Sequence, residues 1–264
     1  MEITKVWALY YSATGTTDKA VNTIAEELAA QLTLPIERLS FTRPAERTGT
    51  HLFTAEDLVV VGSPTYAGRL PNKIAPDFRS GLRGEGTPAV PVVLFGNRSY
   101  DNALAELWSV LMNNGFHPVA AGAFVGRHAF TDKLGEGRPD WDDKRQMRQF
   151  AAQIAGKLRS GRGETVAVPG VSDAPYYIPK GVDGEPVKFL QAKPRTDPGK
   201  CTNCGACARL CPMGAIDPRD VFRVPGTCIK CTRHAKYFDD PAFLSHVAML
   251  EQNFTEPKEN EVFL

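Results

Sequence analysis

The sequence predicts an α/β protein with a doubly wound parallel sheet, followed by a small cysteine-rich domain. Two observations carry this prediction. Apolar runs alternate with helix-patterned stretches over the first 160 residues, and all six cysteines lie between Cys201 and Cys231. Continuous apolar strands separated by helices are typical of a parallel sheet that is buried on both faces.

The composition limits the class of protein. The 264 residues suit one or two domains, and the hydrophobic (42%) and charged (23%) fractions exclude a disordered chain. The net charge of +1 lacks the basic excess of a nucleic-acid-binding protein. The apolar runs are far shorter than the roughly 20 residues that span a bilayer, and the N-terminus does not resemble a signal peptide. We therefore expect a cytoplasmic protein that binds neither nucleic acid nor membrane. The sequence gives no indication of its oligomeric state.

Proline and glycine mark the domain boundary. They make up 12 of residues 161–200, which predicts an irregular linker. We place the first domain at residues 1–160, the linker at 161–195 and the second domain at 196–264. The second domain is expected to end in a helix over residues 239–250 and an acidic, solvent-exposed tail.

Within the first domain, five apolar runs have the composition of buried strands. They cover residues 6–11, 36–41, 58–61, 90–95 and 119–125. Helical periodicity predicts helices around residues 21–28, 101–112 and 140–158. Right-handed crossovers favour a doubly wound sheet, in which ligands bind outside the carboxyl ends of the strands.

The loop after the first strand is rich in hydroxyl groups and precedes a helix. Free backbone N–H groups, the helix dipole and hydroxyl donors can hold a phosphate there. The same residues are also compatible with an ordinary helix N-cap. The candidate phosphate-binding residues are Ser12, Thr14, Gly15, Thr16 and Thr17.

Two further loops, after the third and fourth strands, each carry one tyrosine. Three such loops at one sheet edge suit a flat, phosphorylated cofactor with a π system. The candidate residues of the first of these loops are Ser63, Pro64, Thr65, Tyr66, Ala67 and Gly68. Those of the second are Gly96, Asn97, Tyr100 and Asp101.

These three loops resemble those of flavodoxin over roughly residues 1–160. The resemblance implies a five-stranded sheet in the order 2-1-3-4-5 and an FMN cofactor. It places the phosphate on residues 12–17 and the isoalloxazine between the other two loops. Tyr66 and Tyr100 are then the candidate stacking residues.

The cysteine segment begins with the spacing C-x2-C-x2-C-x3-C-P. This is the bacterial ferredoxin pattern that binds iron–sulfur clusters. Its cysteines are Cys201, Cys204, Cys207 and Cys211. A zinc site could instead use two C-x2-C pairs. Such a site would combine Cys201 and Cys204 with Cys228 and Cys231.

The second half of the ferredoxin pattern is shortened to Cys228 and Cys231, so six cysteines cannot supply the eight thiolates of two complete clusters. Both motifs contain Cys-x3-Ala, which aligns Cys231 with the last cysteine of the first motif. One [4Fe–4S] cluster is therefore expected. Its ligands in this alignment are Cys201, Cys204, Cys207 and Cys231. Cys211 and Cys228 would then be remnants of a second site.

A different alignment treats Cys228 and Cys231 as the first two cysteines of the second motif. His234 then stands where the third cysteine belongs. A second cluster, held by Cys211, Cys228, Cys231 and His234, is then possible, and the first cluster would lack a ligand. His234 also suits an ordinary surface position.

The whole chain resembles flavodoxin–ferredoxin fusion proteins, which occur mainly in anaerobic prokaryotes. The resemblance implies electron transfer between a [4Fe–4S] cluster and FMN, to or from partner redox proteins. The alternative is an FMN-dependent reductase of a small molecule, such as a quinone or nitro compound, with Asp101, Arg98 or His128 near the flavin. We assign no catalytic residue. Because no G-x-G-x-x-G fingerprint is present, direct use of NAD(P)H is not expected.

Overall fold

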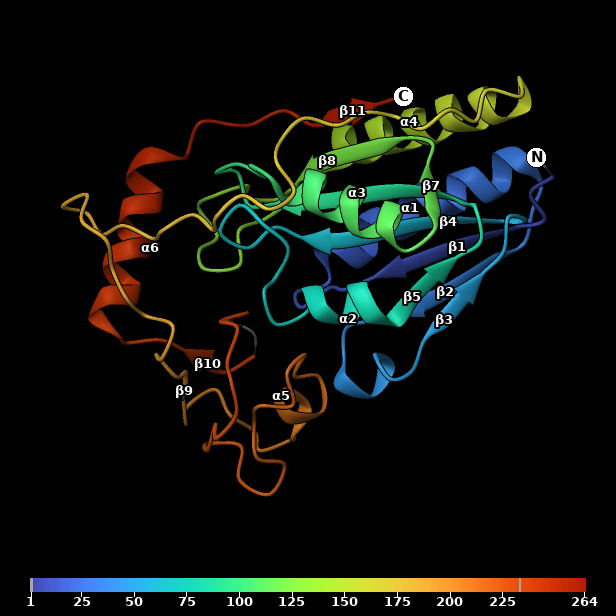
Figure 1. Ribbon diagram of the computed structural model, residues 1–264. Helices are drawn as coiled ribbons and strands as arrows, with labels where there is room; N and C mark the ends of the chain where they lie inside the picture. The colour runs from blue at the N-terminus through green and yellow to red at the C-terminus, as the bar shows by residue number, and fades with distance from the viewer. Residues whose placement is uncertain (1, 233) are drawn as a thin grey trace.

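The computed structural model describes residues 2–232 and 234–264, and its main feature is a mixed sheet of seven strands. Five of them are parallel and lie side by side in the order β2-β1-β4-β6-β8 (Figure 1). When these five strands are numbered in the order in which they occur along the chain, their order in the sheet is 2-1-3-4-5. The predicted fold class is therefore confirmed.

Every predicted strand and helix is present, with bounds that differ from the expected ones by a few residues, and the structure adds one helix and several short strands that the sequence did not predict. The strands are β1 (Lys5–Tyr10), β2 (Ile36–Ser40), β3 (His51–Phe53), β4 (Asp57–Pro64), β5 (Leu82–Gly84), β6 (Thr87–Phe95), β7 (Phe116–Pro118), β8 (Ala121–Val125), β9 (Arg195–Thr196), β10 (Lys236–Tyr237) and β11 (Glu261–Phe263). The helices are α1 (Thr16–Leu32), the 3-10 turn η1 (Pro44–Glu46), α2 (Ala75–Gly81), α3 (Ala103–Asn113), α4 (Trp141–Arg159), α5 (Ala206–Arg209) and α6 (Pro241–Asn253).

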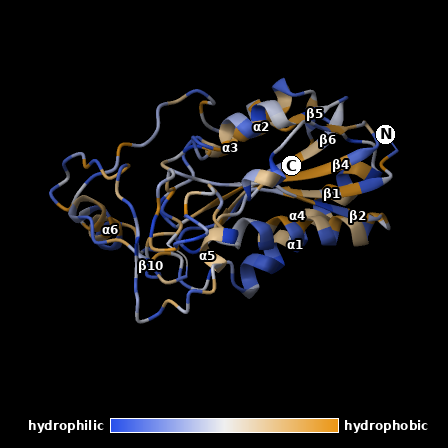
Figure 2. Cartoon of the chain, turned by 90° about the horizontal axis from the view of Figure 1, so that it is seen from below, coloured by the Kyte–Doolittle hydropathy of each residue, from blue (hydrophilic) through white to orange (hydrophobic). Residues whose placement is uncertain are grey.

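Both faces of the parallel sheet are buried, because side chains alternate between two cores. Leu58 and Val60 of β4 pack with α1 and α4, whereas Val59 and Val61 pack with α2 and α3. Figure 2 shows the apolar strands β1, β4 and β6 between these two helical layers. All four residues are fully buried, which explains why β4 is a continuous apolar run in the sequence.

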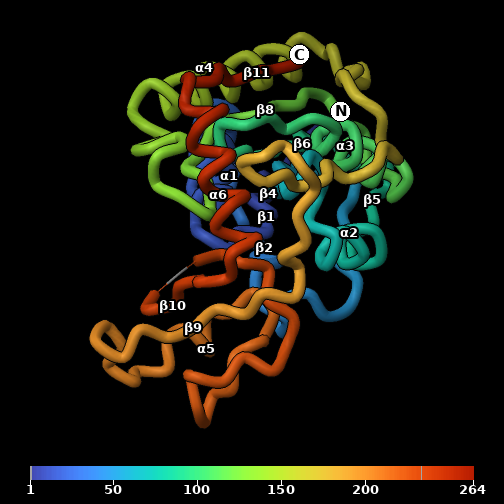
Figure 3. Tube along the Cα trace, turned by 90° about the vertical axis from the view of Figure 1, so that its left-hand side faces the viewer, coloured from blue at the N-terminus to red at the C-terminus, as the bar shows by residue number. Residues whose placement is uncertain are grey.

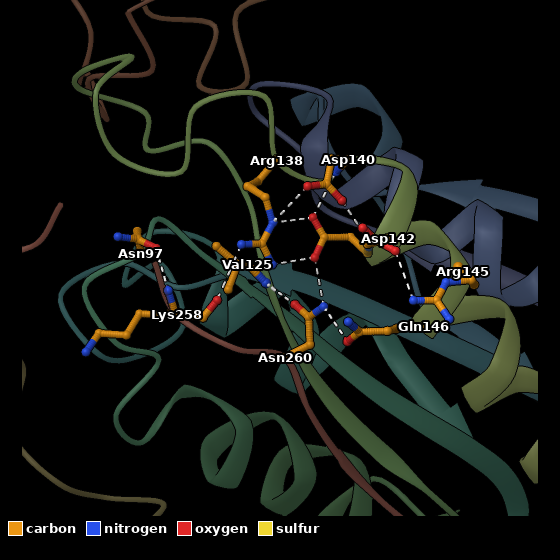
Figure 4. Close-up of polar contacts among 10 residues, drawn as sticks. Asn97, Val125, Arg138, Asp140, Asp142, Arg145, Gln146, Lys258 and Asn260 are labelled. Atoms are coloured by element: carbon orange, nitrogen blue, oxygen red, sulfur yellow. Dashed lines mark hydrogen bonds and ion pairs between the residues drawn. The ribbon is translucent and has the colours of Figure 1, made fainter. Parts of the chain in front are cut away.

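The acidic side chains of the C-terminal tail, Glu256, Glu259 and Glu261, are exposed as expected, but the tail also forms a strand that the sequence did not predict. Its last residues form β11, which pairs antiparallel with β8 and extends the sheet. Asn260 anchors it: its side chain accepts from the backbone of Val125 (2.8 Å) and donates to Asp143 (2.8 Å) and Gln146 (2.9 Å) (Figure 4). These contacts lie far apart in the sequence, so local charge could not reveal them.

The linker is irregular, as expected, but it packs on the first domain. The indole of Trp108 donates to Val166 (2.8 Å), the Tyr176 hydroxyl donates to Leu70 (2.8 Å), and the backbone of Tyr177 donates to Ala67 (2.8 Å). Figure 3 shows the linker running from the first domain past α6 toward β9.

The small cysteine-containing domain has little regular structure. It contains the single turn α5 and the two-residue strands β9 and β10, and it lies beside the carboxyl ends of the main sheet (Figure 1). Helix α6 then leads back toward β11. Among the helices of the described residues, none combines the length and hydrophobicity of a membrane-crossing segment.

Candidate functional site

The candidate phosphate loop connects β1 to α1. Gly15 precedes the helix in a left-handed conformation (φ 87°) and has no side chain that could cap it. Ser12 accepts from the backbone of Asp18 (3.0 Å), which fixes the loop against the first turn, while Thr14 and Thr16 stay partly exposed. The first turn of α1 thus offers a partly exposed end at which N–H groups and hydroxyls can meet an anion.

The loops after β4 and β6 touch each other at the same edge of the sheet. The backbone of Asn102 donates to Gly68 (2.9 Å). A Cβ at Gly68 would lie 2.2 Å from Asp101 Oδ2, so only glycine permits this approach. The two loops predicted to hold the isoalloxazine therefore form one structural unit.

Three non-glycine residues of these two loops have left-handed backbones. They are Ala67 (φ 48°), Asn97 (φ 65°) and Asp101 (φ 43°). Such conformations cost free energy and persist where the surroundings impose them, most often at ligand sites. Their concentration at the carboxyl edge of the sheet supports this edge as the binding site.

Two buried hydroxyl groups at this edge lack a hydrogen-bond partner within the described residues. They belong to Tyr11, at the end of β1, and Thr65, directly after β4. A buried polar atom without a partner is costly, and a flavin held by these loops would offer polar ring atoms to such groups. The residues present at this edge therefore fit a flavin.

The two predicted stacking residues lie in different surroundings. Tyr66 forms a tight turn with Arg69, its backbone N–H lying 2.8 Å from the Arg69 carbonyl oxygen. Tyr100 is buried against Phe95 and donates its hydroxyl hydrogen bond to Glu261 of β11 (2.6 Å). Tyr66 thus belongs to a tight turn within the first of these loops, whereas Tyr100 ties the second loop to the tail.

Asn97, also predicted as a flavin contact, holds the tail as well. Its amide nitrogen donates to the carbonyls of Phe254 (2.6 Å) and Glu256 (2.9 Å), and its oxygen accepts from the backbone of Lys258 (3.1 Å; Figure 4). The side chain of Asn97 therefore links the second loop to the segment between α6 and β11.

A buried carboxylate supports the loop after β4. Glu106 of α3 is only 2% exposed and accepts from Arg69 (2.7 Å), Arg79 (2.7 Å) and the backbone of Leu70 (2.9 Å). Arg69 also donates to the linker at Ser172 (2.8 Å). This buried ion network fixes both the loop and the linker that lies on it.

The small domain packs directly on this edge. Met213, Ile229 and Cys231 contact the apolar core that contains Tyr11. Arg47 donates to the Pro212 carbonyl (3.1 and 3.2 Å). The contact is therefore both apolar and hydrogen-bonded.

The cysteine thiols of the small domain affect the pKa values of Tyr66 and Tyr11 in the first domain. Burial raises the pKa of Tyr66, and the nearby thiols of Cys231 and Cys228 raise it further. Burial likewise raises the pKa of Tyr11, with contributions from Cys231 and Cys211. The structure thus brings Cys231 beside the loop that the sequence assigned to the flavin.

Of the six cysteines, Cys207, Cys211, Cys228 and Cys231 line one largely apolar cavity at this junction. Cys201 and Cys204 lie outside it, and Cys204 is exposed. Within the described residues, no three His, Cys, Asp or Glu side chains converge as ligands of a single metal ion.

Positive charge surrounds Cys228. Lys230 is 4% exposed, its backbone donates to the Cys228 sulfur (3.3 Å) and its ammonium donates to the Leu190 carbonyl (3.0 Å). Burial raises the pKa of the Cys228 thiol, while Lys230 and Lys193 act in the opposite direction. These cations stabilise negative charge on a thiolate or a thiolate-bound group.

His128, named from the sequence as a candidate acid, is partly buried and lies against Gly96 of the second loop. Burial lowers its pKa to about 4, with smaller contributions from His246 and Arg98. Its Nδ1 accepts from the backbone of Phe130 (3.1 Å), so the neutral ring carries its proton on Nε2. A Cβ at Gly96 would lie 2.5 Å from this ring, so the loop closes against it.

A family model described as a 4Fe-4S binding domain matches residues 194–217, which include the first four cysteines. Together with the strand order of the main sheet, this match decides the architecture. The chain is a flavodoxin-like domain joined to a 4Fe–4S ferredoxin domain. The cysteines of the ferredoxin domain accordingly indicate an iron–sulfur cluster. A search of curated proteins found no match.

Solved structures resemble the flavodoxin-like domain at low sequence identity. A flavodoxin from the domain Archaea is 15% identical, covers 59% of this chain and 99% of its own, and has a TM-score of 0.38. Oxidised flavodoxin 2 from Bacillus cereus is 15% identical, with 58% and 99% covered and a TM-score of 0.42.

A third similar structure is rubredoxin oxygen:oxidoreductase from the anaerobe Desulfovibrio gigas. It is 19% identical and has a TM-score of 0.42, with 60% of this chain covered. The match spans 37% of the length of that oxidoreductase.

Sequence reasoning missed several residues of the junction. Tyr11 could have been noticed, because it directly precedes the predicted phosphate loop. Arg47, Glu106 and Lys230 carry no local signal, because each acquires its role from partners distant in the chain.

Proposed function

We propose that this protein is an electron carrier that binds FMN in its flavodoxin-like domain and a [4Fe–4S] cluster in its ferredoxin domain. When bound, the cluster carries one electron at a time and FMN one or two, so the pair can connect a one-electron donor with a two-electron acceptor. The observation that carries the proposal is the position of Cys231 against the core around Tyr11 and beside Tyr66, in the loop assigned to the flavin.

Two residues, Arg47 and Thr232, tie the two domains together across the junction. Arg47 bridges the domains, because it donates to Pro212 and pairs with Asp77 (2.7 Å). Thr232 donates to the Ala129 carbonyl from the ferredoxin side. Because both domains belong to one chain, their effective concentration is high without a separate docking step.

The packing of the loops favours a carrier over a reductase of small molecules. A reductase needs an open flavin face, whereas here Ala67 is covered by the linker through Tyr177, and the ferredoxin domain packs beside Tyr66. Arg98, a candidate group near the flavin, is stacked on the Tyr177 ring (4.3 Å) and paired with Asp101. We therefore favour redox partner proteins as donor and acceptor. The clustered thiols favour a reducing, cytoplasmic environment.

Anaerobic purification with counts of flavin, iron and sulfide per chain tests the proposal. We expect one FMN and at least one cluster, which corresponds to about four irons and four sulfides. A steady-state assay should then show turnover with a protein acceptor and little with quinones or nitro compounds. A colourless protein that contains zinc, or rapid turnover of a small molecule without a protein partner, would contradict the carrier.

A further inference from the structure

A single cavity at the domain junction is lined by two cysteines of the first motif, Cys207 and Cys211, and by three side chains of the shortened second motif, Cys228, Cys231 and His234. We propose that Cys211, Cys228, Cys231 and His234 hold the iron–sulfur cluster nearest the flavodoxin-like domain. The inference rests on the proposed function and specifies its ligands: Cys211 and Cys228 are working ligands rather than remnants.

The backbone around this cavity already donates hydrogen bonds to two of the sulfurs. The Ala215 N–H donates to Cys211 (3.3 Å), and the Lys230 N–H donates to Cys228 (3.3 Å). Hydrogen bonds to sulfur stabilise the charged form of a thiolate ligand and tune an iron–sulfur cluster. Cys211 and Cys228, which have no role in the first alignment, therefore both accept hydrogen bonds from the backbone.

Three residues at or beside the proposed ligands have strained backbones. Lys230, Thr232 and His234 have left-handed conformations, with φ of 60°, 47° and 62°. For residues other than glycine such conformations cost free energy and persist where the surroundings impose them, most often at ligand sites.

The cavity lies next to the edge of the sheet that carries the candidate flavin loops. Cys231 and Ile229 pack against the apolar core that contains Tyr11. Tyr11 directly follows β1, at the carboxyl edge of the sheet. A cluster on these ligands would therefore face the flavin loops directly.

Cys207 also borders the cavity, whereas Cys201 and Cys204 do not. The first alignment needs all three together with Cys231. Only the second alignment draws its whole ligand set from the lining of one cavity, so the geometry favours it.

The ligand type and the surrounding charge also predict the reduction potential of this cluster. A neutral imidazole in place of a thiolate makes a cluster less negative and easier to reduce, as for histidine-ligated centres in general. The buried Lys230, whose backbone N–H donates to the Cys228 sulfur (3.3 Å), adds positive charge beside it. We expect the cluster at the junction to have a higher potential than a four-cysteine cluster at this position.

Anaerobically purified full-length protein, reduced by dithionite and examined by electron paramagnetic resonance, tests the ligand set. The variants are Cys228→Ser, which belongs to the proposed set alone, and Cys204→Ser, which belongs to the first alignment alone. Thr227→Ala, an exposed neighbour of Cys228, is the matched control. His234→Cys keeps four ligands and replaces nitrogen by sulfur.

We expect Cys228→Ser to lose at least nine-tenths of the cluster signal, while the Thr227→Ala signal is unchanged. The wild-type cluster should show hyperfine coupling to a histidine nitrogen. His234→Cys should retain the cluster, lose this coupling and lower the reduction potential. Far-UV circular dichroism and the flavin content show that each variant is folded.

The ligand set is wrong if Cys228→Ser keeps the full signal while Cys204→Ser loses it, or if the wild-type cluster shows no nitrogen coupling. In either case the protein still holds a cluster and a flavin, so the proposed function stands. A wild-type protein without iron overturns both proposals.

Discussion

Glu106 shows how one buried side chain can control the candidate flavin loop. It receives Arg69, Arg79 and the Leu70 N–H inside the protein. Removing one partner of a buried ion pair leaves an uncompensated charge, which typically costs 3–5 kcal/mol.

We expect Glu106→Gln to lower the free energy of unfolding by roughly 3 kcal/mol and to weaken FMN binding, because Arg69 then loses its counter-ion next to the loop. Urea denaturation and a flavin titration measure the two effects. Arg79→Gln is the control, since its side chain is 52% exposed and its removal should cost less than about 1 kcal/mol. Equal losses in both variants would contradict the role given to Glu106.

The lowered pKa of His128 predicts how the stability of the folded protein depends on pH. Its pKa is about 4 in the folded protein and near 6.5 when unfolded, so between these values the unfolded chain binds the extra proton. Stability should therefore fall as the pH decreases from about 6.5 toward 4. Denaturant titrations across this range should show a flatter profile for His128→Gln than for the wild type. His246, whose pKa is also lowered by burial, adds to the same slope and remains in the variant. An identical profile in both proteins would contradict the burial of a neutral His128.

At the scale of elements, β11 depends on Asn260 more than on its own side chains. The Asn260 amide joins Val125, Asp143 and Gln146 across the edge of the sheet. Asn260→Ala leaves the Val125 N–H without its acceptor, and an unsatisfied buried donor costs about 1–3 kcal/mol.

We expect Asn260→Ala to increase amide hydrogen exchange in β8 and β11 and to speed proteolysis of the tail. Lys258→Ala serves as control, because Lys258 contacts Asn97 through its backbone N–H. The account of the tail fails if the exchange rates of β8 do not change in Asn260→Ala.

The sequence predicted the elements whose signal is local. The β4 run and the helices with regular apolar spacing were found, because their residues face the two cores with a fixed period. The cysteine spacing likewise identified the ferredoxin domain, because the motif lies within one short stretch of sequence. Strand β11 was missed, since three residues with one charged side chain become a strand only through pairing with β8. Tyr100 is similar: its loop was identified, but its contact with Glu261 depends on that same distant strand.

At the scale of the whole molecule, the junction joins the domains through a few side chains. Arg47 is the most connected of these: it is 7% exposed, pairs with Asp77 and donates to carbonyls of both domains. Arg47→Met should loosen the ferredoxin domain without removing its cysteines or the flavin loops.

We expect electron transfer from the cluster to the flavin to slow at least tenfold in Arg47→Met, at unchanged iron and flavin content. Arg43→Met is the control, because Arg43 is half-exposed and pairs with Glu46. Stopped-flow spectroscopy of the chemically reduced proteins measures the rates. A wild-type rate in Arg47→Met would show that the contact does not set the domain separation.

The central claim is that one chain holds both redox centres close enough to exchange electrons internally. The most direct measurement reduces the cluster with a short light pulse in the presence of a photoreductant and follows the flavin absorbance under anaerobic conditions. We predict a flavin reduction rate that is constant over a wide range of protein concentration. A rate that rises in proportion to protein concentration would show transfer between molecules and would contradict the account.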